Sequence, residues 1–146
     1  YLDSNWGSVP LERSFVRWDW SRARVADGTA VLYEGRRRDG SDFALALHFD
    51  RTGRAAPFDP PPVQALPKTR IWRIPRGTQA EAGFTPDVAK TLEDTPFYAR
   101  SIINTRLFGQ PVRAVHESLC LRRFSQRWVQ MLLPFRMPRI SGKGAP

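Results

Sequence analysis

The sequence predicts a mainly β protein, an antiparallel meander of the barrel or sandwich type followed by one short C-terminal helix. Apolar and polar residues alternate along several segments, and turn residues recur about every ten positions. The hydrophobic period changes to that of a helix only near the C-terminus. With 146 residues, 41% of them hydrophobic, the chain is long enough for one domain with a buried core.

Three strands are expected first, at residues 15–24, 29–37 and 42–49. Residues 26–28 (ADG) form the first turn, and Asp39-Gly40 supplies the positive φ of a hairpin turn. The alternation assigns each side chain to a face of its strand. In the first strand, one face is expected to carry Val16, Trp18 and Trp20, and the other Phe15, Arg17 and Asp19.

The middle of the chain is harder to interpret. Residues 55–67 are rich in proline and are expected to form a connector or lid, because proline does not fit a central strand. Residues 69–76 are expected to form a short strand, whereas 85–94 fit either a helical turn or a crossing strand. Residues 95–109 and 110–124 then predict a long strand pair.

The C-terminal segment has a helical stripe, because four apolar residues follow one another at helical spacing. These residues are Trp128, Met131, Leu132 and Phe135. Ser125 is the expected N-cap, and Pro134 and Pro138 are expected to end the helix.

Composition excludes several classes of site. The single cysteine, Cys120, rules out an intrachain disulfide or a cysteine metal site, and no stretch is long enough to span a membrane. The net charge of +9 comes almost entirely from arginine, but arginines fall on both faces of the predicted strands. A solvated basic surface is therefore favoured over a nucleic-acid site, which needs a basic stripe interleaved with aromatics on one face.

The histidines do not form a catalytic pair in the sequence. His48 and His116 lie in different predicted strands, and each is expected to be a structural or a surface histidine. His116 and Glu117 are adjacent in a strand and must point to opposite faces.

The opening residues are the candidate acid site. Tyr1, Asp3 and Asn5 share one face if the chain is extended, so the Tyr1 hydroxyl can orient the Asp3 carboxyl. In an apolar pocket Asp3 would keep its proton and act as an acid. A polar strand end with a turn before Gly7 is the alternative.

Four blocks of the sequence together resemble the carotenoid 1,2-hydratases, also called hydroxyneurosporene synthases. They are YLDSNWGSVPLERSFVRWDWSRA (1–23), LEDTPFYARS (92–101), VHESLCLRRF (115–124) and QMLLPFRMPR (130–139). The resemblance implies a lipocalin-like β-barrel fold with two halves. Residues 1–140 would be the second half and 141–146 a flexible tail, which would account for the missing initiator Met.

The same resemblance implies an activity and a site. Family members add water to the terminal C1–C2 double bond of acyclic carotenoids such as neurosporene and lycopene, without a cofactor. By this resemblance Asp3 donates the proton and Tyr1 orients it, and we expect Trp18, Trp20 and Asn5 to contact the substrate. The family's other proposed residues, a His and a Trp, lie upstream of this pair. Trp6 stands where a Glu is expected, which puts any carry-over at that position in doubt.

A long apolar substrate implies a membrane source. We expect a bacterial protein peripheral to the inner membrane, on its cytoplasmic side, with the C-terminal helix and its arginines as the contact. Packing of that helix against the barrel is the alternative. Two other functions keep the same fold: a non-catalytic carrier of an apolar ligand, and an enzyme of different chemistry such as cyclisation.

Overall fold

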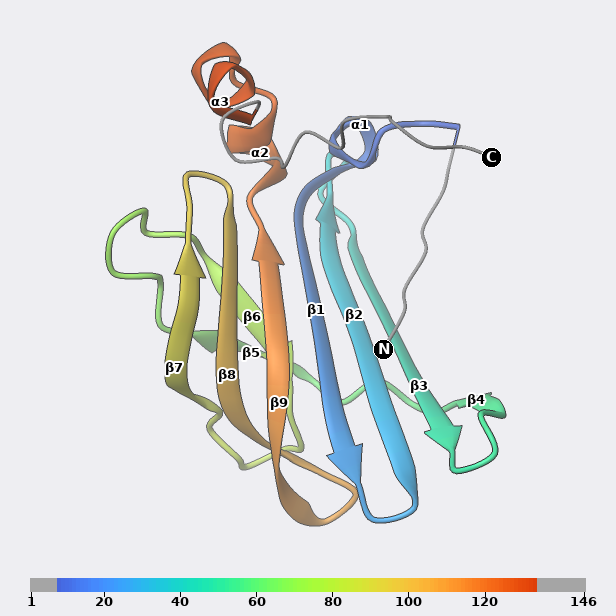
Figure 1. Ribbon diagram of the computed structural model, residues 1–146. Coiled ribbons are helices and arrows are strands. Elements are labelled where there is room, and N and C mark those ends of the chain that lie inside the picture. Colours follow the sequence, from blue (N-terminus) through green and yellow to red (C-terminus); the bar gives the residue numbers. More distant parts are fainter. Residues whose placement is uncertain (1–7, 134–146) are drawn as a thin grey trace, which may run out of the picture.

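The computed structural model describes residues 8–133 (Figure 1). One sheet has seven antiparallel strands in the order β4-β3-β2-β1-β9-β8-β7. Its strands are β1 Phe15–Val25, β2 Gly28–Arg37, β3 Asp42–Asp50, β4 Ala55–Pro57, β7 Asp87–Asp94, β8 Tyr98–Leu107 and β9 Gln110–Leu119. The prediction of a mainly antiparallel β protein with short helices is confirmed.

A second sheet contains two antiparallel strands, β5 (Val63–Leu66) and β6 (Arg76–Gln79), and lies behind the first in Figure 1. Strand β6 contacts β1, β2 and β9 at the centre of the large sheet. We call the face of the large sheet that packs on β6 the inner face and the opposite one the outer face. The helices α1 (Leu11–Ser14), α2 (Leu121–Phe124) and α3 (Arg127–Leu132) gather at one end (Figure 1).

The core lies on the inner face, over the half of the sheet that is distant from the helices. Its side chains come from the long central strands and from β5, and Ile103 is fully buried among them. The cluster consists of Ala23, Val25, Ala30, Leu32, Ala46, Leu66, Ile103, Leu107 and Ala114. Four of its nine residues are alanines, which lets the two sheets approach closely.

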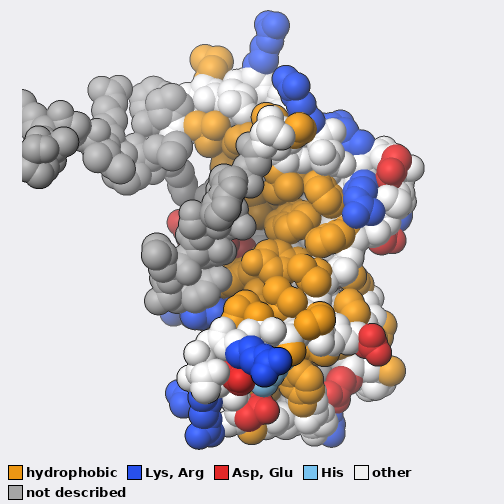
Figure 2. Space-filling model, turned by 90° about the vertical axis from the view of Figure 1, so that its right-hand side faces the viewer, with side chains coloured by type: hydrophobic (Ala, Val, Ile, Leu, Met, Phe, Trp, Pro, Cys, Tyr) orange, Lys and Arg blue, Asp and Glu red, His pale blue; other side chains and the backbone are white. Residues whose placement is uncertain are grey.

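The two edges of the large sheet are not hydrogen-bonded to each other in the described part of the chain, where β4 and β7 are the outermost strands. Strand β7 is a protected edge, because its pairing with β8 is shifted twice and Asp87, Lys90 and Glu93 are charged. The β3 edge differs: viewed from that side, hydrophobic side chains form a continuous area (Figure 2).

Several predicted boundaries were wrong. Residues 69–75 form no strand, and the ladder in this region starts only at Arg76. The proline-rich connector contains β4 and β5, which is possible because both strands are short and each pairs on one side. The ambiguous segment 85–94 contains strand β7, and the predicted strand 110–124 ends at Leu119, where the chain turns into α2.

The first strand departs from simple alternation. Its pairing with β2 shifts between Phe15 and Arg17, so Val16 is an extra residue on the β1 side. The shift brings Phe15 to the same face as Trp18, and the prediction that the two lie on opposite faces is therefore wrong.

The C-terminal helix also differs in detail. It begins at Arg127 with Gln126 as its N-cap residue, while Ser125 ends α2 and donates a hydrogen bond to the Arg122 carbonyl. Val129 is its buried residue, whereas Trp128, Met131 and Leu132 of the predicted stripe are exposed. Phe135, Pro134, Pro138 and residues 141–146 lie outside the described part.

Ile103 offers a direct test of this packing. Ile103→Ala should lower the free energy of unfolding by about 2–5 kcal/mol, because the side chain is fully buried and a cavity would remain. Ile102→Ala is the matched control, since Ile102 is the neighbouring, half-buried residue on the outer face. Urea unfolding of the protein produced from its complete gene measures both. An equal or smaller loss for Ile103→Ala would contradict the assignment of the core.

Candidate functional site

The predicted site residues divide into two groups. Tyr1, Asp3 and Asn5 lie outside the described residues. Trp18 and Trp20 are both in β1 and point to the outer face, because the alternating residues between and beyond them contact β6. The structure therefore brings the two tryptophans together on one face, as expected from their spacing.

Three aromatic rings surround Trp18 on the outer face. The Trp18 ring stacks on Phe43 at 5.4 Å between centroids and 16° between planes, and it meets the edge of Phe15 at 4.9 Å. Tyr33 completes this aromatic cluster at 5.9 Å from Trp18. The Arg37 guanidinium lies 5.4 Å from the Phe43 ring centre. Such faces can stack on a flat conjugated chain and attract positive charge.

A buried polar network occupies the opposite, inner face, and the sequence analysis did not predict it. Asp19 and Glu34 are directly paired across β1 and β2, and they are 1% and 3% exposed. Arg17 lies beside both, with Nε 2.9 Å from Asp19 Oδ2 and Nη2 3.3 Å from Glu34 Oε1. One guanidinium thus faces two buried carboxyl groups.

Strand β6 lies directly over these carboxyl groups. The Gly77 N–H donates to Asp19 Oδ1 at 3.4 Å. A Cβ at Gly77 would lie 2.4 Å from Glu34 Oε1, so any other residue there would require the Glu34 carboxyl to move. Burial raises the pKa of Glu34 to about 8; the adjacent Asp19 adds to the rise and Arg17 opposes it. Near neutral pH, Glu34 therefore holds its proton.

His116 extends the network into β9. Its Nδ1 is 2.8 Å from Ser21 Oγ, and its Nε2 is 2.9 Å from Ser118 Oγ and 3.5 Å from Asp19 Oδ1. Ser21 in turn lies 3.1 Å from Thr78 Oγ1 of β6. His116 is fully buried with both ring nitrogens occupied, which fits the structural role predicted for it. His48, the other histidine, contacts Asp27 at a turn.

Arg76 ties β6 to its surroundings. It donates to the Pro67 carbonyl through Nε at 2.7 Å and to Ser101 Oγ of β8 through Nη1 at 2.8 Å. Burial lowers the pKa of this arginine, since the charged form is partly removed from water. The network thus joins β1, β2, β8 and β9 to β6.

The sequence contains one sign of this network, the charged residues that alternate with aromatic or apolar ones in β1 and β2, but it does not show that their face is covered. Arg17, Asp19 and Glu34 lie at strand positions whose neighbours on the other face are aromatic or apolar. Asp19 of β1 and Glu34 of β2 are directly paired, but such a pair forms a buried polar layer only if another element covers the face to which it points. The covering strand β6 has the sequence RGTQ, which carries no β-branched or aromatic run to identify it.

Two hollows adjoin these features. The first, which we call the mouth cavity, has a volume of about 570 Å³ and lies where β2, β3, β5 and the start of α2 meet. Its lining includes Arg17, Glu34, Asp42, Phe43, Val63 and Arg122. A buried acid and an aromatic of the outer cluster therefore share one cavity.

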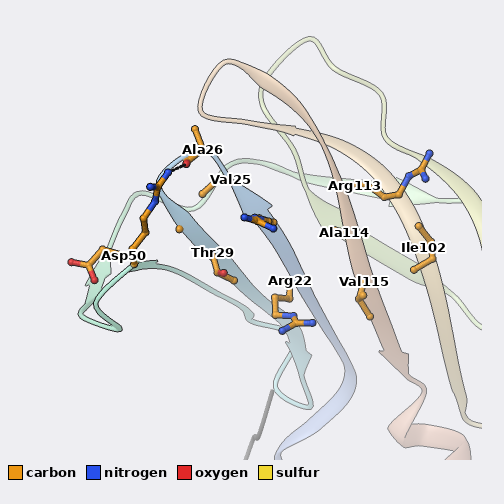
Figure 3. Close-up of a pocket in the computed structure, with 12 residues that line it drawn as sticks. Arg22, Val25, Ala26, Thr29, Asp50, Ile102, Arg113, Ala114 and Val115 are labelled. Atoms are coloured by element: carbon orange, nitrogen blue, oxygen red, sulfur yellow. Dashed lines mark hydrogen bonds between the residues drawn. The ribbon is translucent and has the colours of Figure 1, made fainter.

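The second hollow, of about 830 Å³, is a basic groove at the far end of the outer face (Figure 3). Arg22 and Arg24 of β1, Arg113 of β9 and Arg51 line it, with Asp50 as the acidic residue among them. Arg51 donates to the Ala26 carbonyl at 3.0 Å (Figure 3). The excess of positive charge can attract anions.

No group of three or more His, Cys, Asp and Glu side chains within residues 8–133 is placed to hold a metal ion. None of the helices in this part of the chain is long and apolar enough to cross a membrane.

The sequence profile of carotenoid hydratase CrtC matches residues 1–145. The chain belongs to this family. It is 56% identical over 142 residues to the acyclic carotenoid 1,2-hydratase of Thiocapsa roseopersicina, covering 97% of this chain and 35% of the relative. The enzyme of the same name from Rubrivivax gelatinosus is 47% identical over 140 residues, covering 95% of this chain and 34% of the relative.

The acyclic carotenoid 1,2-hydratase of Cereibacter sphaeroides is 42% identical, with 97% of this chain and 50% of the relative covered. The chain therefore spans about a third to a half of the length of these bacterial relatives. A crystal structure described as an AttH from Nitrosomonas europaea aligns with 80% of this chain and 42% of its own, at a TM-score of 0.55 and 21% identity. At 21% identity, this likeness to the AttH structure shows the fold alone.

Glu34 predicts a specific pH dependence of stability. Between pH 4.5 and 8 the folded state keeps a proton that the unfolded chain releases, so rising pH lowers the free energy of unfolding. Glu34→Gln removes this effect, and over that range the variant should gain on the order of 3–5 kcal/mol relative to wild type. Urea unfolding at several pH values measures it.

The matched control is Glu93→Gln, at an exposed glutamate of the β7 edge, which should keep the wild-type pH dependence. A constant difference between Glu34→Gln and wild type from pH 5 to pH 8 would contradict a buried, protonated Glu34.

Proposed function

We propose that the protein is an acyclic carotenoid 1,2-hydratase, which adds water to the terminal C1–C2 double bond of carotenoids such as neurosporene or lycopene. The 56% identity to a hydratase of that name carries the proposal. Residues 1–140 form the second of two lipocalin-like halves, with 141–146 as a tail. The antiparallel meander and its likeness to the AttH fold support this arrangement.

The chemistry requires an acid, a stabilised cation and water. An isolated alkene is a weak base, so a positioned acid must protonate C2 and leave the positive charge on the tertiary carbon C1. Water then attacks C1, and loss of a proton gives the tertiary alcohol. In this proposal Asp3 is the acid, Tyr1 orients it, and no cofactor takes part.

The aromatic cluster supports the second requirement. Trp18, Phe43 and Tyr33 are half-buried and present ring faces on one side of the sheet. The polyene can stack there, and the cation at C1 gains from the adjacent ring faces. Trp18 and Trp20 are thus assigned to substrate binding, together with Asn5.

Asp3→Asn should lower the hydration rate about 10²–10⁴-fold, the usual contribution of a general acid. The assay uses the protein from its complete gene with lycopene in ¹⁸O-water, and mass spectrometry detects the labelled tertiary alcohol. Asp59→Asn, at an exposed position far from the cluster in sequence, is the matched control and should keep its activity.

Full activity of Asp3→Asn would remove Asp3 from the mechanism. Unchanged carotenoid recovered bound to wild-type protein would favour a carrier of apolar ligands instead.

The membrane contact is proposed at the end where the helices gather. At this end the loop that contains Trp72 packs against α3, because the Trp72 and Trp128 rings stack with their centroids 6.0 Å apart. Arg123 of α2 donates hydrogen bonds to the carbonyls of Trp72 and Pro96. The apolar residues exposed there, the Trp72–Trp128 patch, are Ile71, Trp72, Trp128, Met131 and Leu132. Exposed Lys68, Arg70, Arg73, Arg122 and Arg127 flank it along the chain.

Such a surface suits the interface of an anionic bilayer, because aromatic rings sit at headgroup level and arginines attract the lipid charge. It supports a peripheral location on the cytoplasmic side of the inner membrane, and it gives the carotenoid a source. The acyclic carotenoid and the upstream half are the proposed partners, and no nucleic acid is among them.

The double variant Trp72→Ala/Trp128→Ala should weaken flotation with anionic liposomes about tenfold or more, because two large apolar groups leave the interface. Phe108→Ala, which removes an exposed aromatic in the β8–β9 turn, is the control. Equal flotation of the two variants would exclude the patch as the membrane contact.

A further inference from the structure

We propose that the basic groove binds a long-chain fatty acid, with the carboxylate among the arginines of the groove and the hydrocarbon tail along the adjoining outer face of the sheet. The lining of the groove combines positive charge with apolar side chains. A molecule with an anionic head and an apolar tail matches both. The proposal goes beyond the hydration of a carotenoid and does not depend on it.

The groove opens where β1 and β9 separate. Their pairing ends at Ala23 and Ala114, and just beyond that pair Arg24 and Arg113 line the groove from the two strands. Figure 3 shows Arg22 on the β1 side of the opening and Arg113 on the β9 side. The strand alternation places all three arginines on the outer face. A ligand head therefore has room between two strands that are no longer hydrogen-bonded to each other.

The positive charge of the groove has little acidic compensation. Asp50 also lines it, but its carboxylate accepts hydrogen bonds from the backbone N–H groups of Thr52 and Arg54 within its own turn. Within residues 8–133, neither Arg24 nor Arg113 forms an ion pair. Like charges gathered on one face of a sheet repel one another, and a bound carboxylate would relieve that repulsion.

The apolar part of the groove continues toward the aromatic cluster. Ile102 of β8 and Val115 of β9 are directly paired, and both line the groove. Val115 is also paired with Arg22 of β1, so apolar and basic side chains lie next to each other on one face. Trp18 lies on the same face of β1 as Arg24, about 20 Å away along the strand at about 3.3 Å per residue. A long tail can thus extend from the arginines toward the aromatic rings.

A carboxylate on a single tail suits this site. A guanidinium binds a planar carboxylate through two parallel hydrogen bonds, and each methylene that leaves water adds affinity. At about 830 Å³, the groove can hold the head and the first part of the tail. A bilayer phospholipid is a less suitable source of the anion, because the exposed Trp128 lies in α3, at the opposite end of the sheet (Figure 1).

Isothermal titration calorimetry with three probes separates the head from the tail. Decanoate carries both, decanol has the tail alone, and acetate has the carboxylate alone. With the protein from its complete gene at pH 8, decanoate should bind about tenfold more tightly than decanol, or more, through its charge-assisted hydrogen bonds. Acetate should bind more weakly than decanoate by a similar factor or more. Added salt should reduce the preference for decanoate, because it screens exposed charges.

Two double variants with the same change in net charge locate the head. Arg24→Gln/Arg113→Gln should reduce the preference for decanoate over decanol about fivefold or more, because two guanidinium groups leave the groove. Arg70→Gln/Arg127→Gln is the matched control, since both arginines are exposed and neither lines the groove. It should keep the wild-type preference. Equal binding of decanol by the two variants reports that the fold is intact.

Absence of decanoate binding, equal binding of decanoate and decanol, acetate binding as tight as that of decanoate, or the same preference in both double variants would each overturn the inference. The hydration assay in ¹⁸O-water is read separately. Hydration without decanoate binding would remove this site alone, whereas decanoate binding without hydration would remove the proposed enzyme and leave the fatty-acid site.

Discussion

The close approach of β6 to the inner face of the large sheet is the constraint on which the other features depend. Gly77 favours it, because a side chain there would require the Glu34 carboxyl to move. The approach removes Asp19 and Glu34 from water, and this burial raises the pKa of Glu34 to about 8. Arg17 and His116 contact these carboxyl groups, and hydrogen bonds from Gly77 to Asp19 and between Ser21 and Thr78 link the two sheets through this layer.

Strand β1 serves two environments at once. Its alternation sends Arg17, Asp19 and Ser21 toward β6 and sends Trp18 and Trp20 to the outer face. The polar layer on the inner face holds β1 in position, and the position of β1 in turn sets the positions of Trp18 and Trp20 on the outer face. The buried acid network and the aromatic cluster therefore lie on opposite faces of the same strand.

The two ends of the molecule differ in chemistry. The end with the helices exposes tryptophans and aliphatic side chains among arginines, while the far end of the outer face carries the basic groove without exposed tryptophan in the described part. The mouth cavity also lies at the first end, beside α2. The exposed aromatic residues and the cavity that Glu34 helps to line thus lie at the same end of the sheet.

Local alternation, turn residues and long matching blocks were enough to predict the class of fold, the three N-terminal strands, the β8–β9 pair and the family. Alternation also predicted that Trp18 and Trp20 share one face. Three features became visible only in the folded chain: β6 covers Glu34, Phe15 joins Trp18 through a register shift, and Trp72 stacks on Trp128. These contacts join residues that are far apart in the chain, or they depend on one extra residue in a strand ladder. The pKa of Glu34 is raised by burial, and burial results from the packing of the two sheets and cannot be read from a single segment.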